Sequence, residues 1–335
     1  MKFNNVLITG GAGFIGSHFL KLMAKKYSNT NFINLDLLTY ASDLKNIAFL
    51  NDYDNYKFYE GDICDSLLVS KIFKNHNIDA VINFAAESHV DNSIKNPSDF
   101  IKTNINGTFN LLKTAYSFWM KEPFTFNNGY SHSKFLQIST DEVYGSITSG
   151  SFNESSSYNP SSPYSSSKAG GDLIVRSYNK TYGLPIVITL SCNNFGSNQN
   201  KEKFIPVILN CLNQNIKIPV YGDGLNIRDW ISVEDNCKAI ELVFTKGAVG
   251  ESYNIGGENE FTNIEIIKKI NYHFNKISGK RQNIKINFIK DRYGHDQRYS
   301  IDTSKIKNYL NWNYSNSKFD DSIESLIISF LSKKL

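Results

Sequence analysis

The feature that most constrains the fold is a glycine-rich turn between a strand pattern and a helical pattern near the N-terminus. Gly10, Gly13 and Gly16 follow the apolar run at residues 6–9 and open a segment, residues 14–26, whose apolar side chains recur at helical spacing. A strand, such a turn and a helix form the start of a βαβ unit, and the glycines let backbone N–H groups approach a diphosphate. The turn alone is a moderate signal, because an ordinary strand-to-helix connection can also be rich in glycine.

Further strand patterns at regular intervals predict a parallel sheet. Alternating strands and helices are typical of an α/β fold, here a Rossmann-type doubly wound sheet. The predicted strands are residues 31–36, 56–59, 80–84, 135–139 and 184–190, and two long helices are predicted at residues 104–120 and 164–182. We assign residues 1–192, with a return segment at about 225–255, to a Rossmann-type dinucleotide-binding domain, and residues 193–224 and 256–335 to a smaller mixed substrate-binding lobe.

Two segments are less regular. Residues 148–168 are rich in serine, the composition of a flexible linker, but the strand before them and the helix after them both belong to the α/β pattern. We therefore expect them to be part of the α/β body. Residues 123–134 predict an extended loop near the fifth strand, and residues 264–277 predict an amphipathic helix in the smaller lobe.

Composition excludes several classes of function. The chain has 36 Lys+Arg against 32 Asp+Glu, and a net charge of +4 is too small for a protein that mainly binds nucleic acid or an anionic membrane. Cys64, Cys192, Cys211 and Cys237 are too dispersed to indicate a disulfide framework or a zinc site. No segment approaches the roughly 18 apolar residues of a membrane helix. We expect a cytoplasmic protein without a metal, membrane or nucleic-acid partner.

The cofactor signal extends beyond the turn. Asp36 ends the second strand, where a carboxylate can accept hydrogen bonds from both adenosine ribose hydroxyls and would repel a 2′-phosphate. This position favours NAD over NADP. Asp62 and Ile63 follow the third strand at the place expected for the adenine, and the fourth strand ends in small residues beside the expected cofactor path.

The catalytic signal begins with Tyr164 and Lys168, which share one face of a predicted helix because they are four residues apart. A phenol titrates near pH 10, roughly, but a nearby ammonium and the nicotinamide charge would stabilise its phenolate. Tyr164 could then act as a base near neutrality. Such a pair alone is common on helix surfaces, but with the glycine turn and Asp36 it resembles the extended short-chain dehydrogenase/reductase family. In that family the pair serves hydride transfer and the lysine also holds the nicotinamide ribose.

A carboxylate pair, Asp141 and Glu142, follows the fifth strand, where ligands of open α/β sheets bind. An isolated Asp-Glu pair more often caps a turn. Its surroundings, however, resemble the nucleotide-sugar 4,6-dehydratase branch of the same family from about residue 5 to about residue 305. The segments that carry this resemblance are residues 85–91, 139–145, 164–169, 193–194, 219–224, 228–230 and 291–295.

The resemblance implies a hydro-lyase with tightly bound NAD that converts an NDP-glucose, linked to dTDP or UDP, to the NDP-4-keto-6-deoxy sugar, as in rhamnose and other deoxysugar biosynthesis. Tyr164, helped by Thr140, would take the proton of the 4-hydroxyl. Glu142 would remove the C5 proton, and Asp141 would protonate the departing 6-hydroxyl. These opposite roles need carboxyl groups with separated pKa values.

The resemblance also assigns the rest of the site and an assembly. The cofactor set is Gly10, Gly13, Phe14, Ile15, Gly16, Asp36, Leu37, Thr39, Asp62, Ile63, Phe84, Ala85, Ala86, Ser88, Thr103, Tyr164, Lys168 and Asn194. The substrate set is Ser88, Thr140, Asn193, Lys203, Phe204, Pro219, Tyr221, Arg228, Asn263, Arg292 and His295, with the arginines placed for the diphosphate. A homodimer is implied in which the two long helices pair across a twofold axis.

Departures from the family pattern leave alternatives open. Residues 194–199, Lys203-Phe204 and Tyr293 differ from the usual residues, so the nucleotide and the sugar 2-substituent stay undetermined. One alternative is a UDP-N-acetylglucosamine 4,6-dehydratase, with or without inversion at C5; Glu142 disfavours those members that carry an Asp-Lys pair. Another is a catalytically silent NAD-binding protein, and the four intact catalytic side chains argue against it.

Overall fold

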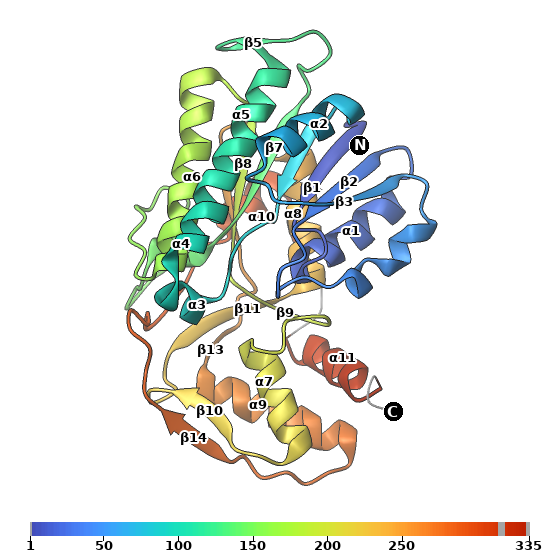
Figure 1. Cartoon of the computed structure of the whole chain (residues 1–335). Helices are drawn as coiled ribbons and strands as arrows, with labels where there is room; N and C mark the ends of the chain where they lie inside the picture. Colours follow the sequence, from blue (N-terminus) through green and yellow to red (C-terminus); the bar gives the residue numbers. More distant parts are fainter. Residues whose placement is uncertain (1, 314–318, 333–335) are drawn as a thin grey trace.

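A parallel sheet of seven strands forms the centre of the computed structural model, which describes residues 2–313 and 319–332 (Figure 1). The strand order is β12-β8-β7-β4-β1-β2-β3, and every neighbouring pair is parallel. The strands are β1 (Asn5–Thr9), β2 (Asn31–Asp36), β3 (Tyr56–Glu60), β4 (Ala80–Asn83), β7 (Lys134–Thr140), β8 (Ile186–Ser191) and β12 (Ser252–Ile255). The chain reverses direction across the sheet between β1 and β4, and such a switch point is where doubly wound sheets bind ligands. The predicted fold class is confirmed.

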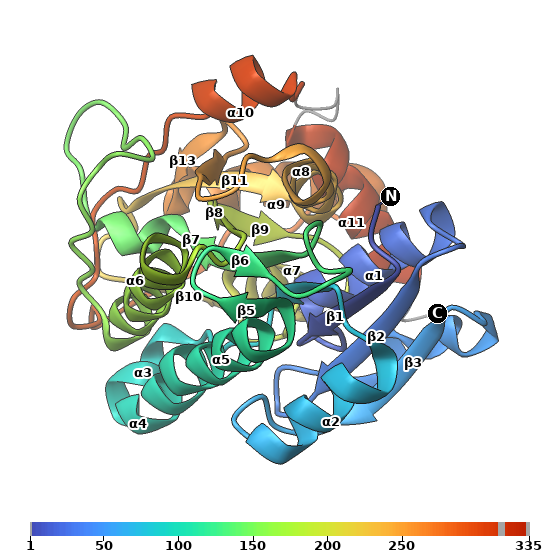
Figure 2. The ribbon, with the colours of Figure 1, turned by 90° about the horizontal axis from the view of Figure 1, so that it is seen from above.

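Helices cover both faces of this sheet (Figure 2). One face packs against α1 (Phe14–Lys26) and α8 (Val233–Lys246), and the other packs against α2 (Ser66–His76), α5 (Thr108–Trp119) and α6 (Pro163–Tyr182). Adjacent residues of a strand point to opposite faces, so Ile8 joins the first core and Leu7 the second. Because both faces are buried there, the central strands β1, β4 and β8 are mostly apolar in sequence, whereas the edge strand β3 has partly exposed side chains and contains Lys57 and Glu60.

A smaller body of helices and short strands lies below the carboxyl ends of the main strands (Figure 1). It contains the parallel pair β10–β14, the three-stranded sheet β13-β11-β9 and its own apolar core. Its elements are β9 (Asn193–Phe195), α7 (Phe204–Gln214), β10 (Ile218–Tyr221), β11 (Ile227–Ser232), β13 (Glu260–Thr262), α9 (Asn263–Ser278), β14 (Ile286–Ile289) and α11 (Phe319–Ser332). The remaining short elements are η1 (Leu44–Asn46), η2 (Ala48–Asp52), α3 (Val90–Lys95), α4 (Pro97–Phe100), η3 (Ile101–Gly107), β5 (Met120–Glu122), β6 (Thr125–Phe126), η4 (Asp141–Tyr144) and α10 (Ser304–Leu310).

The strand predictions are confirmed, with ends shifted by at most two residues, whereas one predicted helix and one predicted loop need correction. The helix predicted at residues 104–120 ends at Trp119 and continues upstream as the π-helical segment η3. Met120 pairs with Phe126 across the β5–β6 hairpin, so the segment predicted as an extended loop contains a strand. The predicted domain boundaries stay a prediction, and residues 314–318 and 333–335, assigned there to the smaller lobe, lie outside the described residues.

The serine-rich segment ends in an ordered helix start. The Ser162 hydroxyl accepts from the Ser165 backbone N–H, and the Ser165 hydroxyl accepts from the Ser162 N–H, which forms a capping box. Pro163 occupies the first turn, where its missing N–H costs no hydrogen bond. These serines therefore fix the position at which α6 begins, directly before Tyr164.

Three properties of the described residues bear on the function classes. No helix among them has the length and apolar character that crossing a bilayer requires. All four cysteines are unpaired. Within the same ranges, no group of three His, Cys, Asp or Glu side chains is placed to hold a metal ion.

Candidate active site

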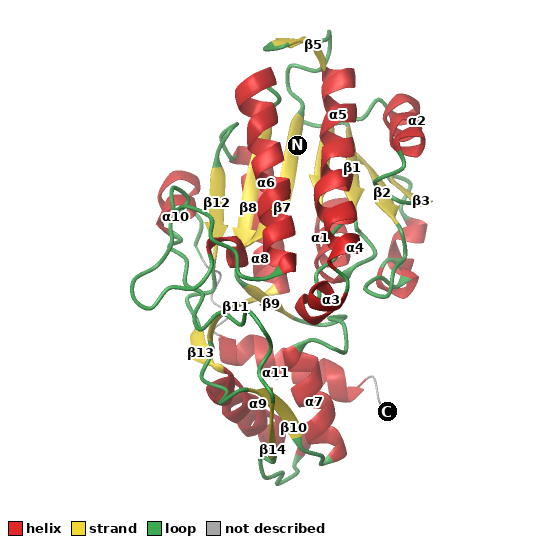
Figure 3. Ribbon diagram, turned by 60° about the vertical axis from the view of Figure 1, so that its left-hand side comes forward, coloured by secondary structure: helices red, strands yellow, loops and turns green. Residues whose placement is uncertain are grey.

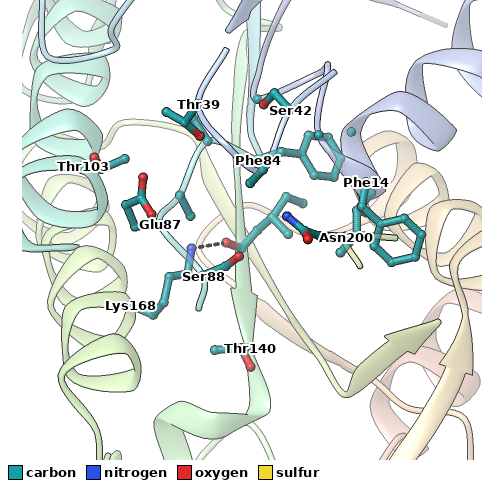
Figure 4. A pocket seen from close by; sticks show the side chains of 18 of the residues that line it. Phe14, Thr39, Ser42, Phe84, Glu87, Ser88, Thr103, Thr140, Lys168 and Asn200 are labelled. Carbon is teal, nitrogen blue, oxygen red and sulfur yellow. Dashed lines mark hydrogen bonds between the residues drawn. The ribbon is translucent and has the colours of Figure 1, made fainter. Parts of the chain in front are cut away.

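A cavity of about 320 Å³ opens at the carboxyl ends of β1, β2, β4 and β7, at the switch point of the sheet. Every residue of the predicted cofactor set and all five predicted catalytic residues line it. Figure 4 shows Phe14 and Phe84 on one side of this pocket and Thr103 and Lys168 on the other, with Thr140 at its end. Segments more than a hundred residues apart in the sequence thus meet in one cavity.

Two positions in the turn that follows β1 must be glycine because neighbouring backbone atoms lie too close for a side chain. Gly10 has a φ of +71°, and a Cβ there would lie 2.7 Å from the Ala85 backbone nitrogen. A Cβ on Gly16 would lie 2.3 Å from the Gly10 carbonyl oxygen, so α1 could not pack as closely on the turn. The turn therefore brings the N-terminus of α1 to the edge of the pocket.

Asp36 lines the pocket from the end of β2 and also holds the glycine-rich turn in place. Its carboxylate accepts from the Ala12 N–H at 2.8 Å and from the Leu38 N–H at 2.9 Å. Each carboxylate oxygen has a second lone pair, so these contacts leave Asp36 able to accept from a ligand as well. Asp36 is 4% exposed, and its two backbone hydrogen bonds hold the carboxylate at the edge of the pocket.

Thr140, Asp141 and Glu142 stand together where β7 ends and the short helix η4 begins. The Thr140 hydroxyl accepts from the Glu142 N–H and donates to Asp141 Oδ1 at 3.2 Å. Asp141 is 2% exposed, and its Oδ2 has no hydrogen-bond partner among the described residues. The β7-to-η4 junction thus holds two carboxyl groups in the same pocket but in different surroundings.

These surroundings act differently on the two carboxyl groups. Burial raises the pKa of Asp141 well above its usual range, and the charges of Glu142 and Asp229 raise it further. Burial also raises the pKa of Glu142, but Arg228, Lys203 and Arg292 oppose this rise. Asp141 is thereby favoured as the protonated member and Glu142 as the ionised one.

Tyr164 and Lys168 project into the pocket from the first two turns of α6. The Lys168 ammonium donates to the Ile138 carbonyl oxygen at 2.7 Å (Figure 4). Burial raises the pKa of Tyr164, and the charges of Glu142 and Asp141 add to the rise, while a hydrogen bond with Thr140 lowers it. Without a cofactor, the protein therefore raises the pKa of Tyr164. The sequence argument predicted a lowered pKa, but it included the positive charge of a bound nicotinamide.

The predicted substrate set divides into two groups. Ser88, Thr140, Asn193 and Lys203 line the pocket, and Lys203 donates to the Ser88 carbonyl oxygen at 2.9 Å. The others lie outside the residues that line it: Phe204, Pro219, Tyr221, Arg228, Asn263, Arg292 and His295. Three of these meet near β10, where the ring of Tyr221 packs against both Arg292 and His295.

Both arginines of the substrate set are already paired within the protein. Arg292 forms an ion pair with Asp91, whose carboxylate also accepts from the Tyr221 hydroxyl at 3.1 Å. Arg228 donates to backbone carbonyls, including that of Asp296 at 2.8 Å. Its guanidinium lies over the Tyr299 ring, 4.1 Å from the centroid.

Sequence reasoning missed several pocket residues. Glu87 lies within the quoted 85–91 motif, so its position there could have identified it. Asp172 does not line the pocket but lies behind it: it is fully buried and accepts from the Ser139 hydroxyl, and its spacing of four residues from Lys168 would have placed it on the same helix face. Ser42, Gln199 and Asn200 come from irregular loops, where no periodic pattern marks them.

Comparisons with known proteins agree with this geometry. A sequence model of the GDP-mannose 4,6 dehydratase family matches residues 7–326. A dTDP-glucose 4,6-dehydratase of Xanthomonas campestris pv. campestris is 44% identical over 311 residues, which cover 91% of this chain and 87% of that protein. The low-salt glycan biosynthesis protein Agl12 of Haloferax volcanii is 44% identical over 327 residues, 98% of each chain.

A solved structure gives the same result for the fold. The dTDP-glucose 4,6-dehydratase of Streptomyces venezuelae, solved with NAD bound, superposes with a TM-score of 0.88 at 40% identity and covers 98% of each chain. The sequence match and the structural match both extend over nearly the whole chain. The protein therefore belongs to the GDP-mannose 4,6 dehydratase family and is similar throughout to dTDP-glucose 4,6-dehydratases.

Proposed function

We propose that this protein is an NAD-dependent dTDP-glucose 4,6-dehydratase. The observation that carries the proposal is the presence of Asp141 and Glu142 in the same pocket as Tyr164 and Lys168. With NAD as the hydride acceptor, oxidation of a sugar hydroxyl needs only one protein side chain, a base such as Tyr164, whereas elimination of water also needs an acid and a second base. The dTDP nucleotide and the glucose are taken from the names of the similar proteins.

The pocket fits NAD at its diphosphate and ribose ends. Helix α1 begins after Gly13, which provides no side-chain cap, so the first-turn N–H groups at the pocket edge are available to an anion. A Cβ at Gly13 would meet protein only at the Gly10 and Ala41 carbonyl oxygens, so the glycine keeps this edge open. Asp36 would hold the adenosine ribose, and Lys168 the nicotinamide ribose. When bound, NAD would supply a hydride acceptor for C4 and a hydride donor for C6.

Three side chains would move the protons of the reaction. The Tyr164 phenolate takes the proton of the 4-hydroxyl, and the product of this oxidation is a 4-ketone. A ketone at C4 acidifies the C5 proton, which the Glu142 carboxylate removes. The protonated Asp141 gives its proton to the departing 6-hydroxyl, which leaves as water. Glu142 then returns its proton to C5.

The smaller body would bind the nucleotide diphosphate. Arg228, Arg292 and Lys203 all lower the pKa of Glu142, so their charges are felt at the catalytic end of the pocket. A diphosphate needs only a few placed cations, which agrees with a whole-chain charge of +4. We propose that Arg292 exchanges Asp91 for a phosphate oxygen when substrate binds.

The proposed assembly is a homodimer through α5 and α6, which lie side by side on one face of the sheet (Figure 3). Large apolar side chains are exposed on and beside these helices: Ile101, Phe109 and Leu173 are 45%, 44% and 57% exposed. A second copy of the chain would cover them. Light scattering at micromolar protein tests this: a dimer mass is expected, and a monomer mass for wild type would contradict it.

The proposed setting is the cytoplasm, with no nucleic-acid or membrane partner. Three of the four cysteines are buried, and none is in a disulfide, as suits a reducing compartment. The weak net charge agrees with a small-molecule substrate. Fractionation of the source cells tests the location, and recovery of the protein in the membrane fraction would contradict it. A nucleic-acid binding assay tests the second statement, and tight binding would contradict it.

The experiment that tests the proposed function is incubation of the purified protein with dTDP-glucose, UDP-glucose and UDP-N-acetylglucosamine in parallel. Mass spectrometry and NMR identify the products. Loss of one water from dTDP-glucose, with a 4-ketone and a C6 methyl group, is expected. If all three sugar nucleotides are returned unchanged by protein that contains NAD, the proposal is wrong.

A further inference from the structure

Three irregular segments contribute residues to the lining of the active-site pocket and come from separate parts of the chain. They are residues 37–42 after β2, residues 85–89 after β4 and residues 199–203 before α7, and we call them the rim segments. Figure 4 shows Thr39, Glu87 and Asn200, one from each segment, at this pocket. Hydrogen bonds between the rim segments would therefore limit how freely a ligand enters or leaves.

Each pair of rim segments has a hydrogen bond of its own. The Tyr40 hydroxyl of the first segment donates to Glu87 Oε2 of the second at 3.2 Å. The Asn200 side-chain amide of the third segment donates to the Tyr40 carbonyl oxygen at 3.3 Å. The Lys203 ammonium, also of the third, donates to the Ser88 carbonyl oxygen of the second at 2.9 Å. The three hydrogen bonds form a closed circuit in which Tyr40 is joined to both other segments.

The first and third rim segments are also attached to the opposite side of the pocket. Ser42 forms a backbone bridge with Gly13 of the glycine-rich turn. His18 of α1 donates to the carbonyl oxygen of Ser197, just before the third segment, at 2.9 Å. A dinucleotide whose diphosphate lies at the start of α1 would thus have the glycine-rich turn on one side and the rim segments on the other.

The hydrogen bond from the Tyr40 hydroxyl lies on the solvent side of the pocket. Tyr40 is 49% exposed and lies outside the residues that line the cavity. Water can replace the partner of an exposed hydrogen bond, so such a contact can open locally while the body of the protein stays folded. The circuit can therefore open at Tyr40 without a change in the two cores of the main sheet.

We propose that the rim segments form a clasp that keeps NAD in the pocket between turnovers, and that the Tyr40 hydroxyl closes it. The clasp rests on the NAD binding that the proposed function includes. The proposed reaction regenerates the oxidised cofactor in each cycle, so slow release of NAD does not limit turnover. Because the contact between Tyr40 and Glu87 joins protein to protein, its loss should speed both release and entry of NAD and change the equilibrium affinity less.

Release of NAD from the loaded enzyme tests the clasp without any sugar nucleotide. Protein that holds radiolabelled NAD is mixed with an excess of unlabelled NAD and filtered at intervals, which gives the release rate. Equilibrium dialysis gives the Kd for NAD. The variants are Tyr40→Phe, which lacks only the hydroxyl, Glu87→Ala, and the double variant. Tyr309→Phe, at an exposed position of α10, is the matched control.

Tyr40→Phe should release NAD roughly 3- to 10-fold faster than wild type, the effect expected for one hydrogen bond, while the Kd changes by a smaller factor. The double variant should release NAD no faster than the faster single variant, because both substitutions remove the same contact. Tyr309→Phe should match wild type.

An unchanged release rate in Tyr40→Phe would overturn the clasp, and so would rate increases that multiply in the double variant. A Kd that rises by the same factor as the release rate would also overturn it, because the hydroxyl would then act on the bound cofactor itself. Addition of dTDP-glucose to the same enzyme reports separately on the function. Slow release of NAD by wild type, fast release by Tyr40→Phe and no loss of water would contradict the dehydratase activity and support the clasp.

Discussion

The two ends of the active site are organised differently. At the cofactor end, formed by the turn at residues 10–16 and Asp36, the groups that would meet a ligand are fixed by backbone contacts and burial. At the proposed substrate end, which contains Tyr221, Arg228 and Arg292, the charged groups already have protein partners. The cofactor end thus needs little rearrangement to accept a ligand, whereas the arginines of the other end, if they bind substrate as proposed, would have to exchange contacts each time a substrate enters or leaves.

The largest effect should come from the catalytic groups that join the two ends. Tyr164→Phe removes the base for the 4-hydroxyl, and kcat should fall by roughly 10²- to 10⁴-fold. The amount of NAD retained by the purified protein should stay that of wild type, because the cofactor end is intact. Ser166→Ala, at an exposed position of the same helix, is the matched control and should leave both measurements unchanged. A Tyr164→Phe enzyme with wild-type kcat would remove Tyr164 from the mechanism.

The same difference explains how much could be predicted from sequence. The cofactor end was predictable because its residues lie at strand ends and on one helix face, where the periods of strands and helices fix their directions. The substrate end comes from irregular segments after β8, and resemblance alone could name Arg228 and Arg292. No sequence pattern shows that Arg292 pairs with Asp91, a residue 201 positions away.

The pKa directions also required the structure. The sequence places Asp141 and Glu142 side by side, but the difference between their pKa values depends on groups from distant segments. Asp229 raises the pKa of Asp141, Arg228 lowers the pKa of both, and Lys203 and Arg292 lower that of Glu142. The helix boundary at Met120 was missed for a related reason, since it is set by pairing with Phe126 across a hairpin and not by local propensity.

A second large effect is expected from a substitution that blocks elimination but leaves oxidation at C4 possible. Glu142→Gln keeps the shape of the side chain but cannot remove the C5 proton, so turnover should fall by about 10² or more while oxidation at C4 continues. Reduced cofactor should then accumulate and be seen by its near-ultraviolet absorbance on addition of dTDP-glucose. Equal loss of oxidation and elimination would contradict the role given to Glu142.

An intermediate effect is expected at the substrate end. Arg292→Lys keeps the charge but loses the forked geometry, and a lost hydrogen bond to a charged group of about 1.5–3 kcal/mol corresponds to a KM increase of roughly 10- to 100-fold. The amount of NAD that the purified variant retains should equal that of wild type. Arg281→Lys, at an exposed position, is the matched control. An unchanged KM for Arg292→Lys would mean that Arg292 stays with Asp91 when substrate binds.

The smallest effect concerns the stability of the fold behind the pocket, at Asp172 of α6. Burial raises the pKa of Asp172 from 3.8 to about 6, against the opposing charge of Lys168. The folded state then holds this proton more tightly than the unfolded state, so Asp172 makes the free energy of unfolding decrease as the pH rises from about 4 to about 6. Asp172→Asn should remove this contribution, so its melting temperature should fall less than that of wild type across this window. If calorimetry shows that the melting temperatures of Asp172→Asn and wild type fall by the same amount across this window, the raised pKa of Asp172 is contradicted.

The central claim is that the residues of this single pocket move the protons of the reaction while the NAD that they would hold would carry the hydride from C4 to C6. Incubation with dTDP-glucose deuterated at C4, followed by NMR of the product, tests it most directly. The account predicts a 4-keto-6-deoxy product with the deuterium in its C6 methyl group. A 4-keto-6-deoxy product without deuterium at C6, or no product at all, would contradict it.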